Sequence, residues 1–243
     1  MLDLSFVGFK YVRFILEEPA PSLLEQMMRR YSFLFVLSEN KLELPNFKLL
    51  VRKTPMIYLS KTLDEIFAGF NKTTRNEIRS TENIKGLDLV FRDGNLNESY
   101  GFYKKIKRAD GVTVDLKREF VDCVFFNGYY SGKMFVSVSC WDNGKVLRLK
   151  SIVSSRKEPD YDKHLISRTT RRLIWEICKY AKEHSYSAID LGGINFEENA
   201  KKGLVQFKSS FGGEIVDIYI YKYETRAFGF LRKVLSLFHI QFT

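Results

Sequence analysis

The chain has 243 residues, of which 45% are hydrophobic and 15% aromatic, and it carries a formal net charge of +10. This length and apolar content exclude a disordered chain and permit one substantial core with a smaller satellite domain. No apolar run approaches the ~18 residues of a membrane-spanning helix, and the first residues lack the basic-then-apolar order of a signal peptide. The positive charge favours an anionic partner: a nucleotide-linked substrate, a CoA-like donor, RNA or a membrane surface.

Side chains that usually bind metals or act as nucleophiles are few and scattered. Three cysteines are widely spaced in apolar stretches, which predicts reduced thiols in the core of a cytoplasmic protein. The three histidines have no partner motif, and the sequence contains no Cys-x-x-Cys, His-Glu-x-x-His, Gly-x-Ser-x-Gly or Walker-type loop. We therefore expect neither a metal centre nor a covalent catalytic triad.

The pattern of apolar residues predicts a strand-rich beginning and then a longer series of helices and strands. In the first part we expect strands at Leu4–Leu16, Ser32–Leu37 and Phe47–Lys53 and a helix near Ser22–Arg30. A capping box at Thr62-Leu-Asp-Glu65 predicts a helix that ends before Gly86. The Asn143-Gly144 pair predicts a hairpin turn of type I′. The later elements are expected at Leu87–Phe91 (strand), Asn97–Ala109 (helix), Asp115 to Gly128 (helix), Met134–Trp141 and Val146–Val153 (strands), Lys163–His184 (helix), Ser187–Leu191 (strand), 197–210 (helix) and Glu214–Tyr223 (strand).

Paired glycines follow one of the short strands. Asp190-Leu-Gly192-Gly193 ends that strand, and a polar segment then leads to Phe207-Lys208 and to a second pair in Phe211-Gly-Gly213. Paired glycines let the backbone approach a ligand closely or adopt a positive φ. The arrangement resembles the signature of the Fem-type branch of the GNAT acyltransferase superfamily. The alternative is a strand-turn-helix-turn-strand connection that binds nothing.

The order of elements from residue 87 onward also matches the GNAT topology. The resemblance implies an α+β fold: a mixed GNAT-like sheet with splayed central strands, plus a smaller, reduced N-terminal α/β domain. We expect that N-terminal domain at 1–86, the acyltransferase domain at 87–224 and an amphipathic helix at 225–243. The tail helix either docks on the domain, forms a homodimer or contacts an anionic membrane.

Three residues of the glycine-rich region are the catalytic candidates. By resemblance, Lys208 stabilises the developing oxyanion or binds an acceptor phosphate, and Phe207 shapes the acyl-transfer pocket. Asp190 either orients the amine and accepts its proton through water or fixes the turn that follows it. The corresponding alternative for Lys208 is a surface position on an amphipathic helix. Transfer would proceed by direct attack, without a covalent enzyme intermediate.

The resemblance also implies a binding site for acyl-CoA. In GNAT proteins the pantetheine arm pairs with one splayed strand, and the pyrophosphate rests at the N-terminus of the next helix. The candidate donor-binding residues are Lys150, Ile152, Ser154, Arg156, Ser167, Arg168, Thr169 and Thr170. The glycine loop of ordinary GNAT members is absent between Gly144 and Gly192, so hydroxyls and cations would have to bind the phosphates. A solvated basic helix start is the alternative.

A basic stripe supplies the candidate acceptor site. Lys72, Arg75 and Arg79 share one helix face and suit an anion such as a nucleotide diphosphate, although a solvated face has the same pattern. Gly192 and Gly193 complete this expected acceptor site.

We weigh three functions. The first is an N-acyltransferase that moves an acyl group from acyl-CoA to a dTDP- or UDP-linked amino sugar, for a bacterial surface polysaccharide such as lipopolysaccharide. The second is a Fem-type transferase that takes an amino acid from aminoacyl-tRNA to a peptidoglycan precursor, which the positive charge also suits. The third is a basic RNA- or membrane-binding module, and its weakness is that most aromatic residues fall at core-periodic positions. No DNA partner is expected.

Overall fold

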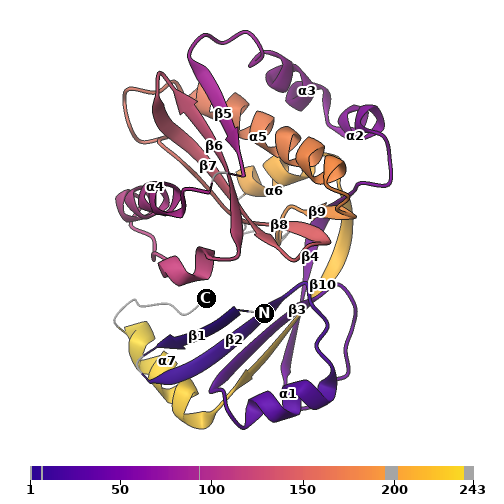
Figure 1. Cartoon of the computed structure of the whole chain (residues 1–243), viewed down its shortest axis with the longest axis vertical. Helices are drawn as coiled ribbons and strands as arrows, with labels where there is room; N and C mark the ends of the chain where they lie inside the picture. Colours follow the sequence, from indigo (N-terminus) through magenta and orange to yellow (C-terminus); the bar gives the residue numbers. More distant parts are fainter. Residues whose placement is uncertain (1, 7, 93, 195–201, 238–243) are drawn as a thin grey trace. The chain divides into compact units, whose positions relative to one another are not determined.

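The computed structural model describes residues 2–6, 8–92, 94–194 and 202–237, which form two compact units (Figure 1). The first unit comprises Met1–Lys53 and Asp217–Thr243, and the second comprises Thr54–Val216. Strands β4 (Lys48–Tyr58) and β10 (Glu214–Glu224) each run from one unit into the other. Each unit has its own buried apolar clusters.

The first unit packs a helix on each face of its sheet. The strands run in the order β1 (Leu2–Phe6), β2 (Phe9–Ile15), β3 (Phe33–Ser38) and β10, and the helices are α1 (Pro21–Met28) and α7 (Arg226–Leu237). β2 and β3 are parallel, whereas the pairs β1–β2 and β3–β10 are antiparallel. Leu24 of α1 packs against Leu34 on one face, and Phe228 of α7 packs against Phe33 on the other. The single strand expected at Leu4–Leu16 is therefore wrong, because Gly8, with a φ of 78°, turns the chain between β1 and β2.

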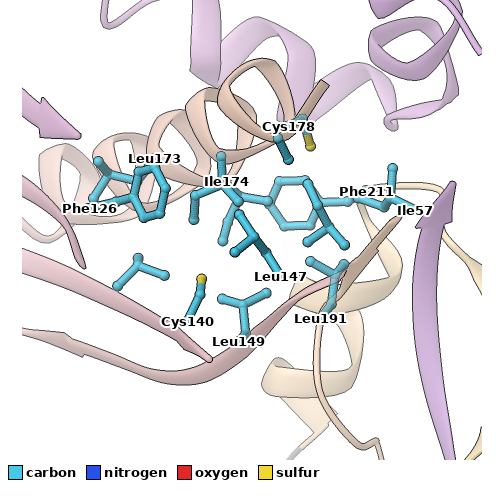
Figure 2. Close-up of a cluster of buried hydrophobic side chains, with 14 of the residues drawn as sticks. Ile57, Phe126, Cys140, Leu147, Leu149, Leu173, Ile174, Cys178, Leu191 and Phe211 are labelled. Carbon is cyan, nitrogen blue, oxygen red and sulfur yellow. The ribbon is translucent and has the colours of Figure 1, made fainter. Parts of the chain in front are cut away.

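The second unit is a mixed sheet covered by helices on both faces (Figure 1). Its strands run in the order β4, β9 (Ala188–Asp190), β8 (Val146–Ser154), β7 (Lys133–Asp142), β6 (Cys123–Tyr130) and β5 (Leu87–Phe91). Its helices are α2 (Leu63–Gly69), α3 (Lys72–Arg79), α4 (Leu96–Ala109), α5 (Lys163–Glu183) and α6 (Lys202–Ser209). Leu173 and Ile174 of α5 lie over Leu147 and Leu149 of β8 in the main core (Figure 2). On the opposite face, Ile106 of α4 joins a separate apolar cluster.

The two parallel strands at the centre of this unit diverge. β8 pairs with β9 only from Val146 to Arg148, opposite Ala188 to Asp190, and then continues alone on that side to Ser154. The chain after β9 turns toward β4, where the Leu191 N–H donates to the Pro55 carbonyl at 3.0 Å. The predicted α+β fold, with a mixed sheet and splayed central strands, is thereby confirmed.

The helix expected from Asp115 to Gly128 is wrong. A short 3₁₀ helix, η1 (Lys117–Phe120), leads instead into β6, which pairs with β5 on one side and β7 on the other. β6 buries Phe125 in one apolar cluster and Phe126 in the cluster on the opposite face. A strand buried on both faces has a nearly continuous apolar run, and periodicity cannot distinguish such a run from a buried helix.

The helix expected from Thr62 to Gly86 begins as predicted but is divided in two. The capping box is present, because Glu65 N–H donates to the Thr62 hydroxyl at 3.2 Å and the Glu65 carboxylate accepts from Thr62 N–H at 2.8 Å. Asn71 then caps α3 by accepting from the Thr74 N–H at 2.7 Å. Ile66 of α2 and Ile78 of α3 both pack in the core of the second unit. The expected domain boundary at 86–87 therefore falls inside that unit, and the part of the expected 197–210 helix before residue 202 lies outside the described residues.

Candidate functional site

Asp190, the last residue of β9, is completely buried and has three hydrogen-bond partners. Its carboxylate accepts from the Arg148 guanidinium, from the Thr54 hydroxyl and, at 2.7 Å, from the Gly192 N–H. The first contact is an ion pair across the parallel strands β8 and β9. These contacts give Asp190 the arrangement of a residue that fixes the following turn, and they occupy both of its oxygens.

The turn after Asp190 holds the side chain of Lys208. Gly192 has a φ of 78°, and a Cβ at this position would lie 3.2 Å from Lys208 Nζ and 3.3 Å from the Leu149 carbonyl oxygen. Lys208, near the end of α6, donates from Nζ to the carbonyl oxygens of Gly192 at 3.0 Å and Gly193 at 3.1 Å. The positive φ favours glycine here, and a methyl group would fit tightly beside the ammonium. Lys208 thus lies where β8 and β9 separate.

The environment of Lys208 perturbs its ionisation. Burial, and secondarily the positive charge of Arg148, lower the pKa of Lys208 from 10.5 to about 8. A lysine ammonium has three N–H donors, and the two glycine carbonyls accept from two of them. With this pKa, Lys208 is mostly a cation at neutral pH and loses its charge within a mildly alkaline range.

Phe207, the neighbour of Lys208 on α6, is held between an aromatic ring and a guanidinium. Its ring meets that of Phe211 edge-on at 5.1 Å, and the Arg171 guanidinium lies 5.3 Å from its centroid. Arg171 of α5 also pairs with Glu77 of α3 at 3.1 Å. Phe207 lines both of the cavities described below.

The larger cavity has a volume of about 570 Å³ and lies along Ile152–Ser154, the part of β8 beyond its pairing with β9. Five of the predicted donor-binding residues line it: Ile152, Ser154, Arg156, Ser167 and Thr170. Lys107, Lys157 and Lys202 add positive charge to the lining, and Asp110, paired with Lys157 at 2.9 Å, is the acidic residue among them. The lining of this cavity therefore combines apolar side chains with several cations.

The other three predicted donor-binding residues do not line this cavity. The side chain of Lys150 is buried, 3.0 Å from Asp115 and 4.4 Å from the centroid of Phe120. Thr169 packs against Gly128 of β6, and Arg168 lies 3.7 Å from Asp162. On a helix, residues three apart share a face, so Ser167 and Thr170 point together into the cavity while the two residues between them do not.

A second, smaller cavity of about 210 Å³ shares Gly203 and Phe207 with the larger one. Its lining is mostly polar: Asn71, Thr73, Thr74, Arg171, Gly203, Gln206, Phe207 and Ser210. Two contacts bring α3 to the end of α6, namely the Asn71 N–H to the Ser210 carbonyl at 2.9 Å and the Thr74 hydroxyl to the Ser210 hydroxyl at 3.0 Å. The sequence analysis missed Arg171 and Gln206, because only this long-range contact makes them neighbours.

The predicted acceptor cations on α3 have local partners. Arg75 donates to the carbonyl oxygens of Ala68, at 2.8 Å, and Phe70, which satisfies the C-terminal end of α2. The Arg79 guanidinium lies 5.3 Å from the ring centroid of Phe67. Lys72 is exposed in the first turn of α3. Neither described cavity is lined by these three residues, whereas their neighbour Thr73 lines the smaller one.

The described residues contain neither a membrane-spanning helix nor a metal-binding cluster. None of the helices described is long and apolar enough to cross a bilayer. The same part of the chain holds no group of three or more His, Cys, Asp or Glu side chains placed to bind a metal ion.

Comparison with known proteins finds one family model that matches part of the chain and several solved structures with a similar fold. The model of the FemAB family matches residues 152–220, which include the cavity wall on β8, the glycine turn and α6. The structure of FemX is similar over 92% of this chain and 82% of its own, with 12% identity and a TM-score of 0.63. A C-terminal domain described as a lysylphosphatidylglycerol synthetase of Agrobacterium fabrum has 12% identity over 93% of this chain and 82% of its own, with a TM-score of 0.60.

A third structure represents the GNAT branch. A protein from Novosphingobium aromaticivorans, described as an acetyltransferase of the GNAT family, covers 92% of each chain with 8% identity and a TM-score of 0.51. At these identities the likeness shows the fold, and that fold is of the Fem and GNAT type. No curated protein matches the sequence significantly.

Proposed function

We propose that the chain is an N-acyltransferase that moves an acyl group from acyl-CoA to the amine of an amino sugar. The observation that carries this proposal is the divergence of β8 from β9 beside a cavity of about 570 Å³. A free strand edge offers backbone N–H and C=O groups to the amides of a pantetheine arm. The basic residues around the cavity suit the phosphates of CoA.

The proposed chemistry needs no covalent enzyme intermediate. The acceptor amine, in its neutral form, attacks the thioester carbonyl, so that a C–N bond forms and the C–S bond then breaks. The amine proton passes to water, and the thiolate of CoA takes a proton as it leaves. Two N–H groups of the Lys208 ammonium donate to the glycine carbonyls. In this proposal the third N–H donates to the thioester oxygen on which negative charge develops.

The smaller cavity is the proposed place of the acceptor. Its hydroxyl, amide and guanidinium groups suit the hydroxyls of a sugar ring, and Phe207 offers a flat apolar surface. We extend the proposal to a sugar linked to dTDP or UDP, which would serve the synthesis of a bacterial surface polysaccharide such as lipopolysaccharide. The reaction would take place in the cytoplasm. This last step rests on the resemblance of the glycine-rich region to Fem-type proteins.

A second candidate is transfer of an amino acid from aminoacyl-tRNA. The FemAB match over residues 152–220, the likeness to FemX and the net charge of +10 favour it. Both candidates use the same divergent strands and differ in the donor. Purified protein that carries nucleic acid, seen as a high ratio of absorbance at 260 and 280 nm, would favour tRNA.

The donor can be tested with one pair of variants. CoA should raise the melting temperature of the protein, because a ligand of the native state stabilises it by mass action. Leu204→Trp places a bulky side chain in the cavity lining and should abolish this rise, whereas Val121→Trp, at an exposed position outside the lining, should not. A mass-spectrometric screen of acyl-CoAs against nucleotide-linked amino sugars then identifies the pair of substrates. No thermal shift at millimolar CoA would contradict the acyl-CoA proposal.

A further inference from the structure

The smaller cavity has hydrogen-bond donors that the described part of the chain does not use. Arg171 is the only charged residue among the described residues that line it. Its guanidinium contacts both the Ser167 hydroxyl and the Glu77 carboxylate through Nη1. Nη2 makes no hydrogen bond or ion pair with a described residue. Both N–H groups of Nη2 are therefore uncommitted within that part of the chain.

The position of this guanidinium is fixed before any ligand binds. Ser167 holds it from the preceding turn of α5 and Glu77 from α3, and the ring centroid of Phe207 lies 5.3 Å from it. The side chain of Arg171 is only 17% exposed, and Glu77 offsets its charge in the free protein. Because these contacts use Nη1, they leave Nη2 for an oxyanion, with which a guanidinium makes charge-assisted hydrogen bonds. A group held in place in this way loses little conformational freedom when the oxyanion binds.

Three uncharged side chains of the lining have unused donors as well. Asn71 Nδ2, the Thr73 hydroxyl and the Gln206 amide are at exposed positions and have no hydrogen-bond partner among the described residues. The buried hydroxyls of Thr74 and Ser210 bond instead to each other, at 3.0 Å. The described lining thus offers guanidinium, amide and hydroxyl donors without a carboxylate, which is a composition that favours a ligand oxyanion.

The volume of the cavity limits what it can enclose. About 210 Å³ is below the roughly 300 Å³ at which pockets for whole drug-sized ligands begin. A single carboxylate or phosphate group with a few neighbouring atoms therefore suits the cavity better than a whole nucleotide does.

We propose that the smaller cavity binds an oxyanion of the acceptor, a carboxylate or a phosphate, and that Arg171 is the residue that selects it. The acceptor is then an acidic amino compound, in which this oxyanion and the reacting amine belong to one molecule. This inference deepens the proposed function and rests on it in assigning the smaller cavity to the acceptor. Binding of an oxyanion is an equilibrium property of the cavity, so it can be measured without any transfer.

NMR titration of the ¹⁵N-labelled full chain with inorganic phosphate, and separately with acetate, tests this site. The reporter is the Nε–H resonance of Arg171, which is assigned by its absence in Arg171→Gln. At constant ionic strength we expect this resonance to shift and saturate with at least one of the two anions. The anion that binds more tightly identifies the oxyanion as a phosphate or a carboxylate. A resonance that moves with neither anion would overturn the proposal.

Thr73→Asp places a carboxylate in the lining without endangering the fold. Thr73 is in the first turn of α3, where a negative charge stabilises a helix, so the melting temperature should not fall. Repulsion between like charges should weaken anion binding about tenfold or more. Asn76→Asp is the matched control, because it adds the same charge to the same helix at an exposed position outside the lining. It should bind as the unaltered chain does, and equal affinities in the two variants would overturn the site.

The thermal shift with CoA reports separately on the donor. Thr73→Asp should keep this shift, since Thr73 does not line the larger cavity. If anion binding is lost in Thr73→Asp while CoA shifts no variant, the oxyanion site stands and the acyl-CoA proposal fails. A normal shift with CoA, together with an Arg171 resonance that ignores both anions, would contradict the oxyanion site alone.

Discussion

The ammonium of Lys208 lies 3.0 Å from the carbonyl oxygen of Gly192, two residues beyond the end of β9. This contact connects α6 to the point where the two parallel strands part. Because Asp190 holds the N–H of the same glycine, the turn is fixed from both sides. The backbone geometry at the opening between β8 and β9 therefore depends on a small polar network.

Replacing Lys208 by Met removes the cation at nearly constant volume. We expect the transfer rate to fall about 10²- to 10³-fold, the usual effect of removing one donor to a developing oxyanion. The far-UV circular dichroism spectrum should be unchanged. Lys85→Met, at an exposed turn of the same unit, is the charge-matched control and should keep full activity. A variant at Lys208 with nearly normal turnover would contradict the role proposed for this residue.

The pH dependence of transfer follows from the lowered pKa of Lys208. If its cation stabilises the oxyanion, this contribution is complete well below pH 8 and is lost as the pH rises through about 8. On the acid limb the rate should rise with pH, because the acceptor amine loses its proton and becomes nucleophilic. The plot of rate against pH should therefore be bell-shaped. In Lys208→Arg the cation persists to high pH, and the alkaline limb should disappear. An alkaline limb that is identical in both proteins would assign it to another group.

Gly192→Ala should destabilise the second unit more than a glycine replacement at a comparable φ. Gly132 has a φ of 77° and open space within 4 Å of the position that a methyl group would take, whereas a methyl at Gly192 (φ 78°) would meet Lys208 Nζ and the Leu149 carbonyl. Gly132→Ala therefore measures the backbone strain alone, about 1–2 kcal/mol. Chemical denaturation should give a larger loss for Gly192→Ala, together with reduced transfer activity. Equal losses would show that Lys208 moves aside without cost.

The sequence predicts best those features that local chemistry determines. The hairpin at Asn143-Gly144, the capping box of Thr62 and the short strand before the paired glycines are all present, because neighbouring residues suffice to specify each of them. The predicted type I′ geometry of that hairpin is wrong, because Gly144 has a positive φ and Asn143 does not. The resemblance of the glycine-rich region to Fem-type proteins also predicted that the central parallel strands diverge. Gly212, however, is explained by close packing against the Gly69 carbonyl rather than by a ligand.

Features that arise from long-range contacts could not be predicted in this way. β6 has the apolar run of a buried helix, and only its pairing with two strands decides otherwise. Arg75 is in a basic stripe, yet its partners are carbonyls at the end of α2, a helix whose C-terminus the sequence placed too late. Arg171 and Gln206 become neighbours only when α3, α5 and α6 pack together.

The ion pair between Arg148 and Asp190 gives a last prediction, on stability. Both residues are buried, so Arg148→Met leaves an uncompensated carboxylate in the core and should lower the free energy of unfolding by about 3–5 kcal/mol. Arg148→Met combined with Asp190→Asn removes that charge while the amide oxygen still accepts from the Gly192 N–H and the Thr54 hydroxyl. Urea unfolding should therefore find the double variant more stable than the single one. A double variant as unstable as the sum of its two single variants would mean that the ion pair does not couple the two strands.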